Sequence, residues 1–101
     1  MAKTRRRPPV HPGEILREDL MKPSGLSING LARELRVPVT RMSEIVNGRR
    51  SITADTALRL ARYFGTTPQF WMNLQAAYDL DVAARVSATR IARDVHPREA
   101  A

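Results

Sequence analysis

Hydrophobic residues recur along the chain in short groups, and within each group their spacing is that of one face of an α-helix. Ile15, Leu16 and Leu20 form the first group, and prolines and glycines separate the groups from one another. No stretch alternates hydrophobic and polar positions over the length of a β-strand. The pattern therefore predicts an all-α domain with five helices, at residues 12–21, 27–35, 38–46, 53–64 and 67–82 or longer.

Polar residues and glycines mark the ends of these helices. Ser27, Thr53 and Thr67 stand where an N-cap is needed to accept a hydrogen bond from an unpaired backbone N–H. Gly48 and Gly65 follow the third and fourth helices, as expected for a left-handed residue that ends a helix. The local signals therefore agree with the hydrophobic pattern.

The net charge is positive and unevenly distributed. The chain has 101 residues and a formal net charge of +7, with +4 in residues 1–12 and +3 in residues 36–50. Such clustering is typical of nucleic-acid-binding proteins, although basic patches also bind acidic proteins and membranes. We expect a basic flexible arm at residues 1–10, a folded domain at 11–84 and a helical extension or tail at 85–101.

Several classes of protein conflict with the composition. No hydrophobic run approaches the roughly 20 residues of a membrane span, and the basic N-terminus lacks the hydrophobic region of a secretory signal. The chain has no cysteine, which excludes disulfides, cysteine-ligated zinc and a thiol nucleophile. His11 and His96 lie far apart and are expected to be cap, surface or tail residues. We therefore predict no metal site, cofactor or catalytic group, and a soluble cytoplasmic protein that is not an enzyme.

The turn between the second and third predicted helices indicates a function. Only a few residues separate helix 27–35 from helix 38–46, so the two helices must cross at a steep angle. The hydrophobic residues placed to pack them together are Leu31, Ala32, Val37, Met42 and Ile45. This is the arrangement of a helix-turn-helix, whose second helix lies in the major groove of DNA. The other interpretation is a helical hairpin with a solvated outer face.

The residues on the outer face of the third helix suit contact with base edges. Val39 can touch a thymine methyl group, Thr40 can form a hydrogen bond, and Arg41 can bind guanine O6 and N7 through two N–H groups. Ser43 and Glu44 lie one turn further along. These five residues are the predicted base contacts.

Contacts to the DNA backbone position a protein without reading sequence. They are predicted for Ser27, Pro38, Asn47, Arg49 and Arg50, and for Arg5, Arg6 and Arg7 of the arm. The other interpretation of the arm is a solubilising tail.

Several sequence motifs resemble a known family. LSINGLARELRV at residues 26–37 and IVNG at residues 45–48 are similar to the helix-turn-helix of phage-repressor-type (Xre/Cro) regulators. Four motifs resemble the HigA branch of antitoxins: HPGEIL at 11–16, SEIVNGRR at 43–50, TADTALRLA at 53–61 and FWMNLQ at 70–75. The resemblance extends over about residues 11–80, and FW-x-NLQ is its most distinctive motif.

The resemblance implies a five-helix domain that dimerises, represses its own promoter and neutralises a ribonuclease toxin of the HigB type. It implies that Pro38 to Glu44 form the recognition helix and that Asn47 contacts the DNA backbone. The implied partners are a double-stranded operator with two-fold related half-sites, the toxin and a second copy of the chain, without a cofactor.

The chain departs from the broad family at two positions. Arg36 stands between the two helices where glycine is common, and it would be strained if its φ were positive. Ile28 stands where a polar residue often binds phosphate. Neither departure removes the residues predicted to contact bases.

One face of the last helix carries large hydrophobic residues: Phe70, Trp71, Leu74 and Tyr78. They form either core or a dimer interface, and the resemblance favours this helix as the interface. On the first helix, Glu14, Glu18 and Asp19 form an acidic surface. This surface is a candidate docking site for a basic toxin, or else a solvated helix exterior.

Three other functions stay open from the sequence. The chain could be a stand-alone Xre-family transcription regulator without a toxin partner. It could also be a protein-only antidote whose helix-turn-helix does not bind DNA. An enzyme is the third possibility, for which the chain offers no motif.

Overall fold

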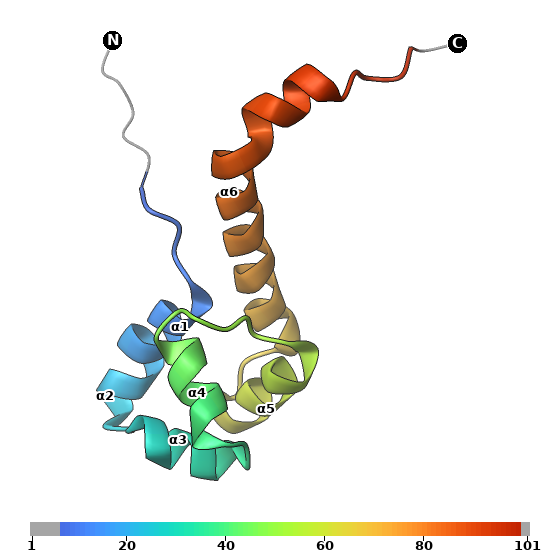
Figure 1. Cartoon of the computed structure of the whole chain (residues 1–101). Helices are drawn as coiled ribbons and strands as arrows, with labels where there is room; N and C mark the ends of the chain where they lie inside the picture. Colours follow the sequence, from blue (N-terminus) through green and yellow to red (C-terminus); the bar gives the residue numbers. More distant parts are fainter. Residues whose placement is uncertain (1–6, 100–101) are drawn as a thin grey trace.

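The computed structural model describes residues 7–99, and that part of the chain consists of helices and loops (Figure 1). The helical elements are α1 (Pro12–Ile15), the π-helical turn η1 (Leu16–Met21), α2 (Lys22–Ser24), α3 (Ile28–Leu35), α4 (Val39–Val46), α5 (Ala54–Phe64) and α6 (Pro68–Asp94). The first three follow one another without a break, so the described residues form five helical rods. The predicted all-α, five-helix architecture is confirmed.

The first rod is longer than predicted, because it continues through Pro23 instead of ending at Met21. In an α-helix, proline lacks the N–H that the ladder needs and its ring clashes with the carbonyl four residues back. Here the preceding turn is wider, since the Lys22 N–H bonds to the carbonyl of Arg17, five residues back. A π turn of this kind accommodates the proline. Gly25, at a φ of 68°, then ends the rod.

The helix ends follow the predicted signals. Ser27, Thr53 and Thr67 each accept a hydrogen bond from the backbone N–H three residues further on. Gly48 and Gly65 have φ values of 76° and 75°, which glycine adopts without strain. Local sequence therefore sets where these helices begin and end.

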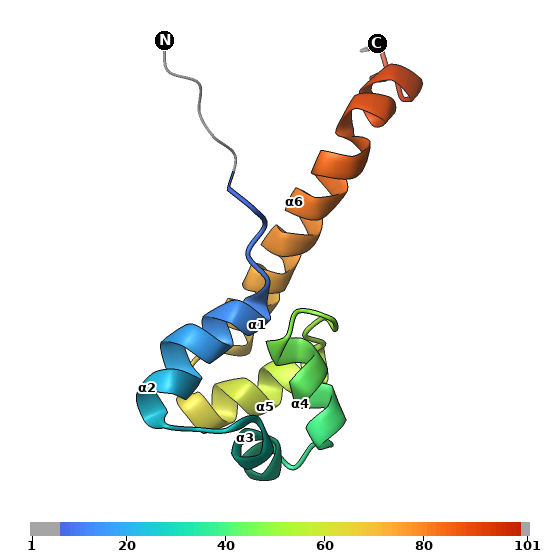
Figure 2. The same cartoon turned by 60° about the vertical axis from the view of Figure 1, so that its left-hand side comes forward.

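The hydrophobic core lies where α3, α4 and α5 meet the first rod and the start of α6 (Figure 2). Trp71 is the largest side chain within it and is 0% exposed, and its indole N–H donates to Thr66 Oγ1 at 2.8 Å. The buried hydrophobic residues are Leu16, Met21, Leu31, Ala32, Leu35, Met42, Ile45, Val46, Ile52, Ala57, Leu60, Ala61 and Trp71. Of the two roles expected for Trp71, core is therefore confirmed and a dimer interface is wrong, because its ring is enclosed within one protomer.

Helix α6 is much longer than the part of it that packs on the core. Its buried residues, Trp71 and Gln75, lie in its first two turns, and the rest projects away from the other helices (Figures 1 and 2). The helix ends at Asp94, so the extension expected at residues 85–101 is helical up to that residue. None of the described helices is both long and apolar enough to cross a membrane.

Candidate nucleic-acid interface

The turn between α3 and α4 has the hydrogen bonds of a Schellman motif. The Arg36 N–H bonds to the carbonyl of Arg33 at 3.2 Å, and the Val37 N–H bonds to that of Ala32 at 3.1 Å. This motif needs a residue in the left-handed region, and Arg36 occupies it with φ 59° and ψ 46°. The strain foreseen for a non-glycine residue is therefore present. The turn leaves only three residues between α3 and α4, so the two helices pack directly against each other.

A close contact between α1 and α4 fixes the other end of α4. A Cβ added to Gly13 would lie 1.9 Å from the carbonyl oxygen of Ile45. Glycine is therefore the residue that allows the start of α1 to reach the backbone of α4. His11 caps α1 beside it, where Nδ1 accepts the Gly13 N–H at 2.9 Å. A cap was one of the roles expected of His11, whereas no local signal in the sequence revealed the close contact at Gly13.

The amino-terminal turn of α4 presents the predicted base contacts. Val39 is 46% exposed although it is hydrophobic, and Thr40 beside it is exposed. Ser43 and Glu44, one turn later, are half-buried. An exposed valine and threonine at a helix start are suited to the methyl groups and hydrogen-bonding edges of the major groove.

Arg41 lies on the same turn, but its side chain is held by α5. Its Nη1 is 3.0 Å from Asp55 Oδ2, and Arg59 Nε is 2.9 Å from the same oxygen. Hydrogen bonds from Arg59 and then Arg41 lower the pKa of the Asp55 carboxyl group, so the carboxylate stays charged at neutral pH. Asp55 was not among the predicted site residues. Its position two residues after the Thr53 cap gives no sign that it reaches α4.

A second ion pair joins the end of α4 to the loop that follows it. Arg50 Nε is 2.8 Å from Glu44 Oε1. Asn47 folds back in the same region, and its side-chain amide donates to the carbonyl of Ser43 at 2.8 Å. The carboxylate of Glu44 would repel a phosphate backbone, and Arg50 offsets that charge.

The other predicted backbone contacts lie in several parts of the described chain, and Arg7 lies beside α6, where its carbonyl accepts a hydrogen bond from Arg85. Pro38 and Arg49 are exposed, as is Arg7 in the arm. Ser27 is exposed, but its hydroxyl is engaged in capping α3 at Gly30. Arg5 and Arg6 lie outside the described residues.

Gln75 of α6 holds the loop between α4 and α5 through hydrogen bonds, a role that the sequence did not predict. Its Oε1 accepts the Ile52 N–H at 2.8 Å, and its Nε2 donates to Ser51 Oγ at 3.3 Å and to Asp79 Oδ1 at 2.9 Å. Gln75 is 4% exposed, so these bonds satisfy a buried amide. The signal available in the sequence was the glutamine at the end of FWMNLQ.

The remaining candidate residues lie away from α4. Phe70 is exposed, while Leu74 and Tyr78 are half-buried on α6, and the Tyr78 ring packs edge-on against His11 at 4.9 Å between centroids. The acidic residues Glu14, Glu18 and Asp19 are all exposed. Hydrogen bonds from Lys22 and then Arg17 lower the pKa of Glu18. No group of three or more His, Asp or Glu side chains within residues 7–99 is placed to hold a metal ion.

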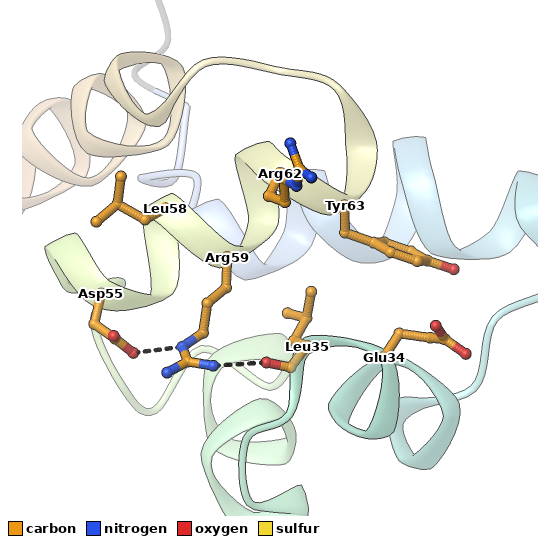
Figure 3. Close-up of a pocket in the computed structure, with 7 residues that line it drawn as sticks. All are labelled: Glu34, Leu35, Asp55, Leu58, Arg59, Arg62 and Tyr63. Atoms are coloured by element: carbon orange, nitrogen blue, oxygen red, sulfur yellow. Dashed lines mark hydrogen bonds and ion pairs between the residues drawn. The ribbon is translucent and has the colours of Figure 1, made fainter.

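An open groove of about 540 Å³ lies beside the helix-turn-helix, between the end of α3 and α5 (Figure 3). Its lining residues are Glu34, Leu35, Asp55, Leu58, Arg59, Arg62 and Tyr63. Figure 3 shows Arg59 reaching from α5 to both Asp55 and the Leu35 carbonyl, at the floor of the groove.

Comparison with known proteins agrees with this geometry. The Helix-turn-helix family model matches residues 18–71, which include α3, α4 and α5. The fold is similar to that of an addiction module antidote protein of the HigA family from Coxiella burnetii. The TM-score is 0.86 and the identity 53%, over 91% of this chain and 100% of that one. The chain belongs to the HigA family.

This HigA-family chain is also similar to a second solved structure and to a virulence-associated protein. The structure titled Pseudomonas aeruginosa antitoxin HigA with higBA promoter has a TM-score of 0.88 and 43% identity, over 90% of this chain and 99% of that one. Virulence-associated protein I of Dichelobacter nodosus is 59% identical over 76 residues, 75% of this chain and 70% of that protein. The resemblance seen in the motifs is thereby confirmed.

Proposed function

We propose that this HigA-family chain is a sequence-specific DNA-binding antitoxin. It binds its own promoter as a dimer, represses the toxin–antitoxin genes and neutralises a partner ribonuclease toxin of the HigB type. The observation that carries the proposal is the exposed first turn of α4, with Val39 and Thr40 outward, in a chain 43% identical to an antitoxin solved with promoter DNA. In this proposal the chain is not an enzyme, and it acts in the cytoplasm, associated with the bacterial nucleoid when it is bound to DNA.

The residues of α4 divide into two roles. Val39, Thr40 and Arg41 read base edges in the major groove, with Ser43 and Glu44 one turn further along. Arg49 and Arg50 follow the helix and contact phosphates, which sets the position of α4 in the groove. Because these contacts displace counterions, the logarithm of the binding constant falls linearly with the logarithm of the salt concentration.

A dimer allows the protein to contact two half-sites of the operator at once. Two α4 helices about 34–36 Å apart can enter half-sites one turn of DNA apart. We propose α6 as the dimerisation helix, because Phe70 is exposed and the helix projects beyond the core with Leu80 and Ile91 also exposed. Leu74 and Tyr78, half-buried on the same helix, contribute at its edge.

The toxin-binding surface in this proposal is the acidic face of the first rod. Glu14, Glu18 and Asp19 are exposed there. A ribonuclease that binds RNA is expected to be basic, and such a face attracts a basic partner electrostatically.

An electrophoretic mobility-shift titration with the upstream intergenic DNA tests the proposal. Arg41→Ala is expected to weaken operator binding by about 1–3 kcal/mol while toxin neutralisation persists. Arg98→Ala is the matched control, because it removes the same charge from the exposed segment that follows α6. Equal binding of operator and scrambled duplex by the wild-type protein would refute DNA reading and leave a protein-only antidote.

A further inference from the structure

We propose that Asp55 is a specificity-determining positioning residue, which holds the Arg41 guanidinium in the orientation that reads a base. This inference rests on the proposed function, since it concerns how α4 discriminates between DNA sequences. Asp55 acts through Arg41 and does not itself contact DNA in this proposal.

A continuous chain of bonds connects Arg41 to all three helices of the site. Arg41 Nη1 on α4 lies 3.0 Å from Asp55 Oδ2 on α5. Arg59 Nε, one turn along α5, lies 2.9 Å from that same oxygen. Arg59 Nη1 then donates to the carbonyl of Leu35, the last residue of α3, at 3.0 Å (Figure 3). The Asp55 oxygen that binds Arg41 is therefore also held by Arg59, which is itself anchored to α3.

The anchoring points are rigid, which makes this arrangement effective for positioning. Arg41 is the third residue of α4 and Asp55 the second residue of α5, so neither backbone belongs to a loop. An unrestrained arginine loses about 0.5–1.5 kcal/mol of side-chain entropy when an interface immobilises it. Asp55 restricts the Arg41 side chain before DNA arrives, so less of that cost falls on binding.

Holding Arg41 in place also favours contacts to base edges over contacts to phosphates. An arginine that moves freely is attracted to any phosphate, and that attraction carries no sequence information. The charge of Asp55 offsets that of Arg41 and so weakens this attraction. A guanidinium carries five N–H groups, and the bond through Nη1 leaves others able to bind guanine O6 and N7. The side chain of Arg41 is still 30% exposed in this pose.

The surroundings of Asp55 favour a carboxylate that stays ionised and paired with Arg41. The Asp55 side chain is 56% exposed, so it is not required by the core. The lowered pKa of its carboxyl group keeps it ionised well below neutral pH. A small cavity of about 200 Å³ lies between Arg41, Asp55 and the Ser51 loop, which gives the arginine room to rotate if the carboxylate is lost.

The experiment compares dissociation constants for the operator and a scrambled duplex of the same length. Asp55→Asn keeps the shape and removes the charge, and Glu99→Gln removes the same charge from an exposed position in the segment that follows α6. Asp55→Asn is expected to lower the specificity ratio about tenfold, the size of the discrimination that one base contact supplies. It should also steepen the salt dependence on scrambled duplex by about one phosphate contact. Glu99→Gln should leave the ratio unchanged.

A double-mutant comparison separates positioning from a structural role. In an Arg41→Ala background, Asp55→Asn should have no further effect on the ratio, because the residue through which it acts is gone. An undiminished effect in that background overturns the inference, as does an Asp55→Asn protein whose specificity ratio matches that of Glu99→Gln. A wild-type protein without sequence preference is a different outcome, because it refutes the proposed function as well.

A measurement without DNA gives a second readout. NMR relaxation of the Arg41 Nε–H in the unbound protein reports its picosecond–nanosecond mobility. Asp55→Asn, with an unchanged melting temperature, should raise this mobility, and Arg59→Gln should raise it to a smaller degree. Equal mobility in the wild-type and Asp55→Asn proteins overturns the inference.

Discussion

Gly13 provides the sharpest test of how the recognition helix is held. In Gly13→Ala, the new Cβ would lie 1.9 Å from the carbonyl oxygen of Ile45, whereas ordinary contact begins at 3.4 Å. The obstacle is backbone and cannot rotate away, so α1 and α4 must separate by about 1.5 Å. A gap of even 0.5–1 Å removes about a quarter to a half of the dispersion energy of the atoms that line it.

The expected cost follows from these distances. Overpacking of a core usually costs about 1–3 kcal/mol, and a backbone clash belongs at the upper end. Alanine in a helix recovers up to about 1 kcal/mol relative to glycine. We therefore expect Gly13→Ala to lower the free energy of unfolding by about 2–3 kcal/mol. For a domain of this size the melting temperature should fall by about 10–20 °C.

Thermal denaturation followed by far-ultraviolet circular dichroism measures the effect. Gly30→Ala is the matched control, because its Cβ would lie 3.1 Å from its nearest neighbour, the hydroxyl of Ser27, and would meet no backbone atom of another helix. It should change the free energy of unfolding by less than about 1 kcal/mol. If Gly13→Ala is as stable as Gly30→Ala, the close approach of α1 to α4 is wrong. Operator binding should weaken in Gly13→Ala alone, since Ile45 belongs to α4.

Three further predictions concern stability. Gln75→Leu should lower the free energy of unfolding by about 1–3 kcal/mol in urea denaturation, because it leaves the buried Ile52 N–H unpaired; the exposed Asn73→Leu should change it by less than about 0.5 kcal/mol. Burial lowers the pKa of His11 below its ordinary value of 6.5, against the opposing effects of the Arg50 backbone and Asp79. As the pH falls, the His11 imidazole is therefore protonated in the unfolded chain at a higher pH than in the folded protein, so the free energy of unfolding should fall as the pH drops below about 6.5. His11→Asn keeps an oxygen that can cap α1 and should flatten this pH dependence between pH 7 and 5. Arg36→Gly should raise the unfolding free energy by about 0.5–1 kcal/mol, because it relieves a left-handed arginine at the cost of a more flexible unfolded chain; an unchanged denaturation midpoint would contradict the strain.

The five helices and their caps could be predicted because the signals are local. Ser27 needs only the N–H three residues away to act as a cap, and Gly65 needs only its own φ. The hydrophobic spacing of α3 and α4 also predicted which of their side chains are buried. The extension of the first rod through Pro23 escaped prediction, because a π turn has no sequence signal as clear as that of a proline.

The candidate site could be predicted in part. The face of α4 that carries Val39 and Thr40 follows from helical periodicity and is exposed as expected. The ion pair of Arg41 does not follow from helical periodicity, because its partner Asp55 is 14 residues away on another helix. The role of Trp71 stayed open between core and dimer interface for a similar reason, since hydrophobic spacing on α6 cannot separate a core position from a surface that covers a second chain.

By itself, the sequence determined where the helices begin and end, which turn joins α3 to α4, and which side chains that turn leaves outward. Each of these depends on atoms a few residues apart. Tertiary structure alone decided that Gly13 admits the backbone of α4, that Gln75 anchors the loop before α5, and that Asp55 holds Arg41. Those contacts join residues distant in the chain, and they exist only once packing of the core has brought the helices together.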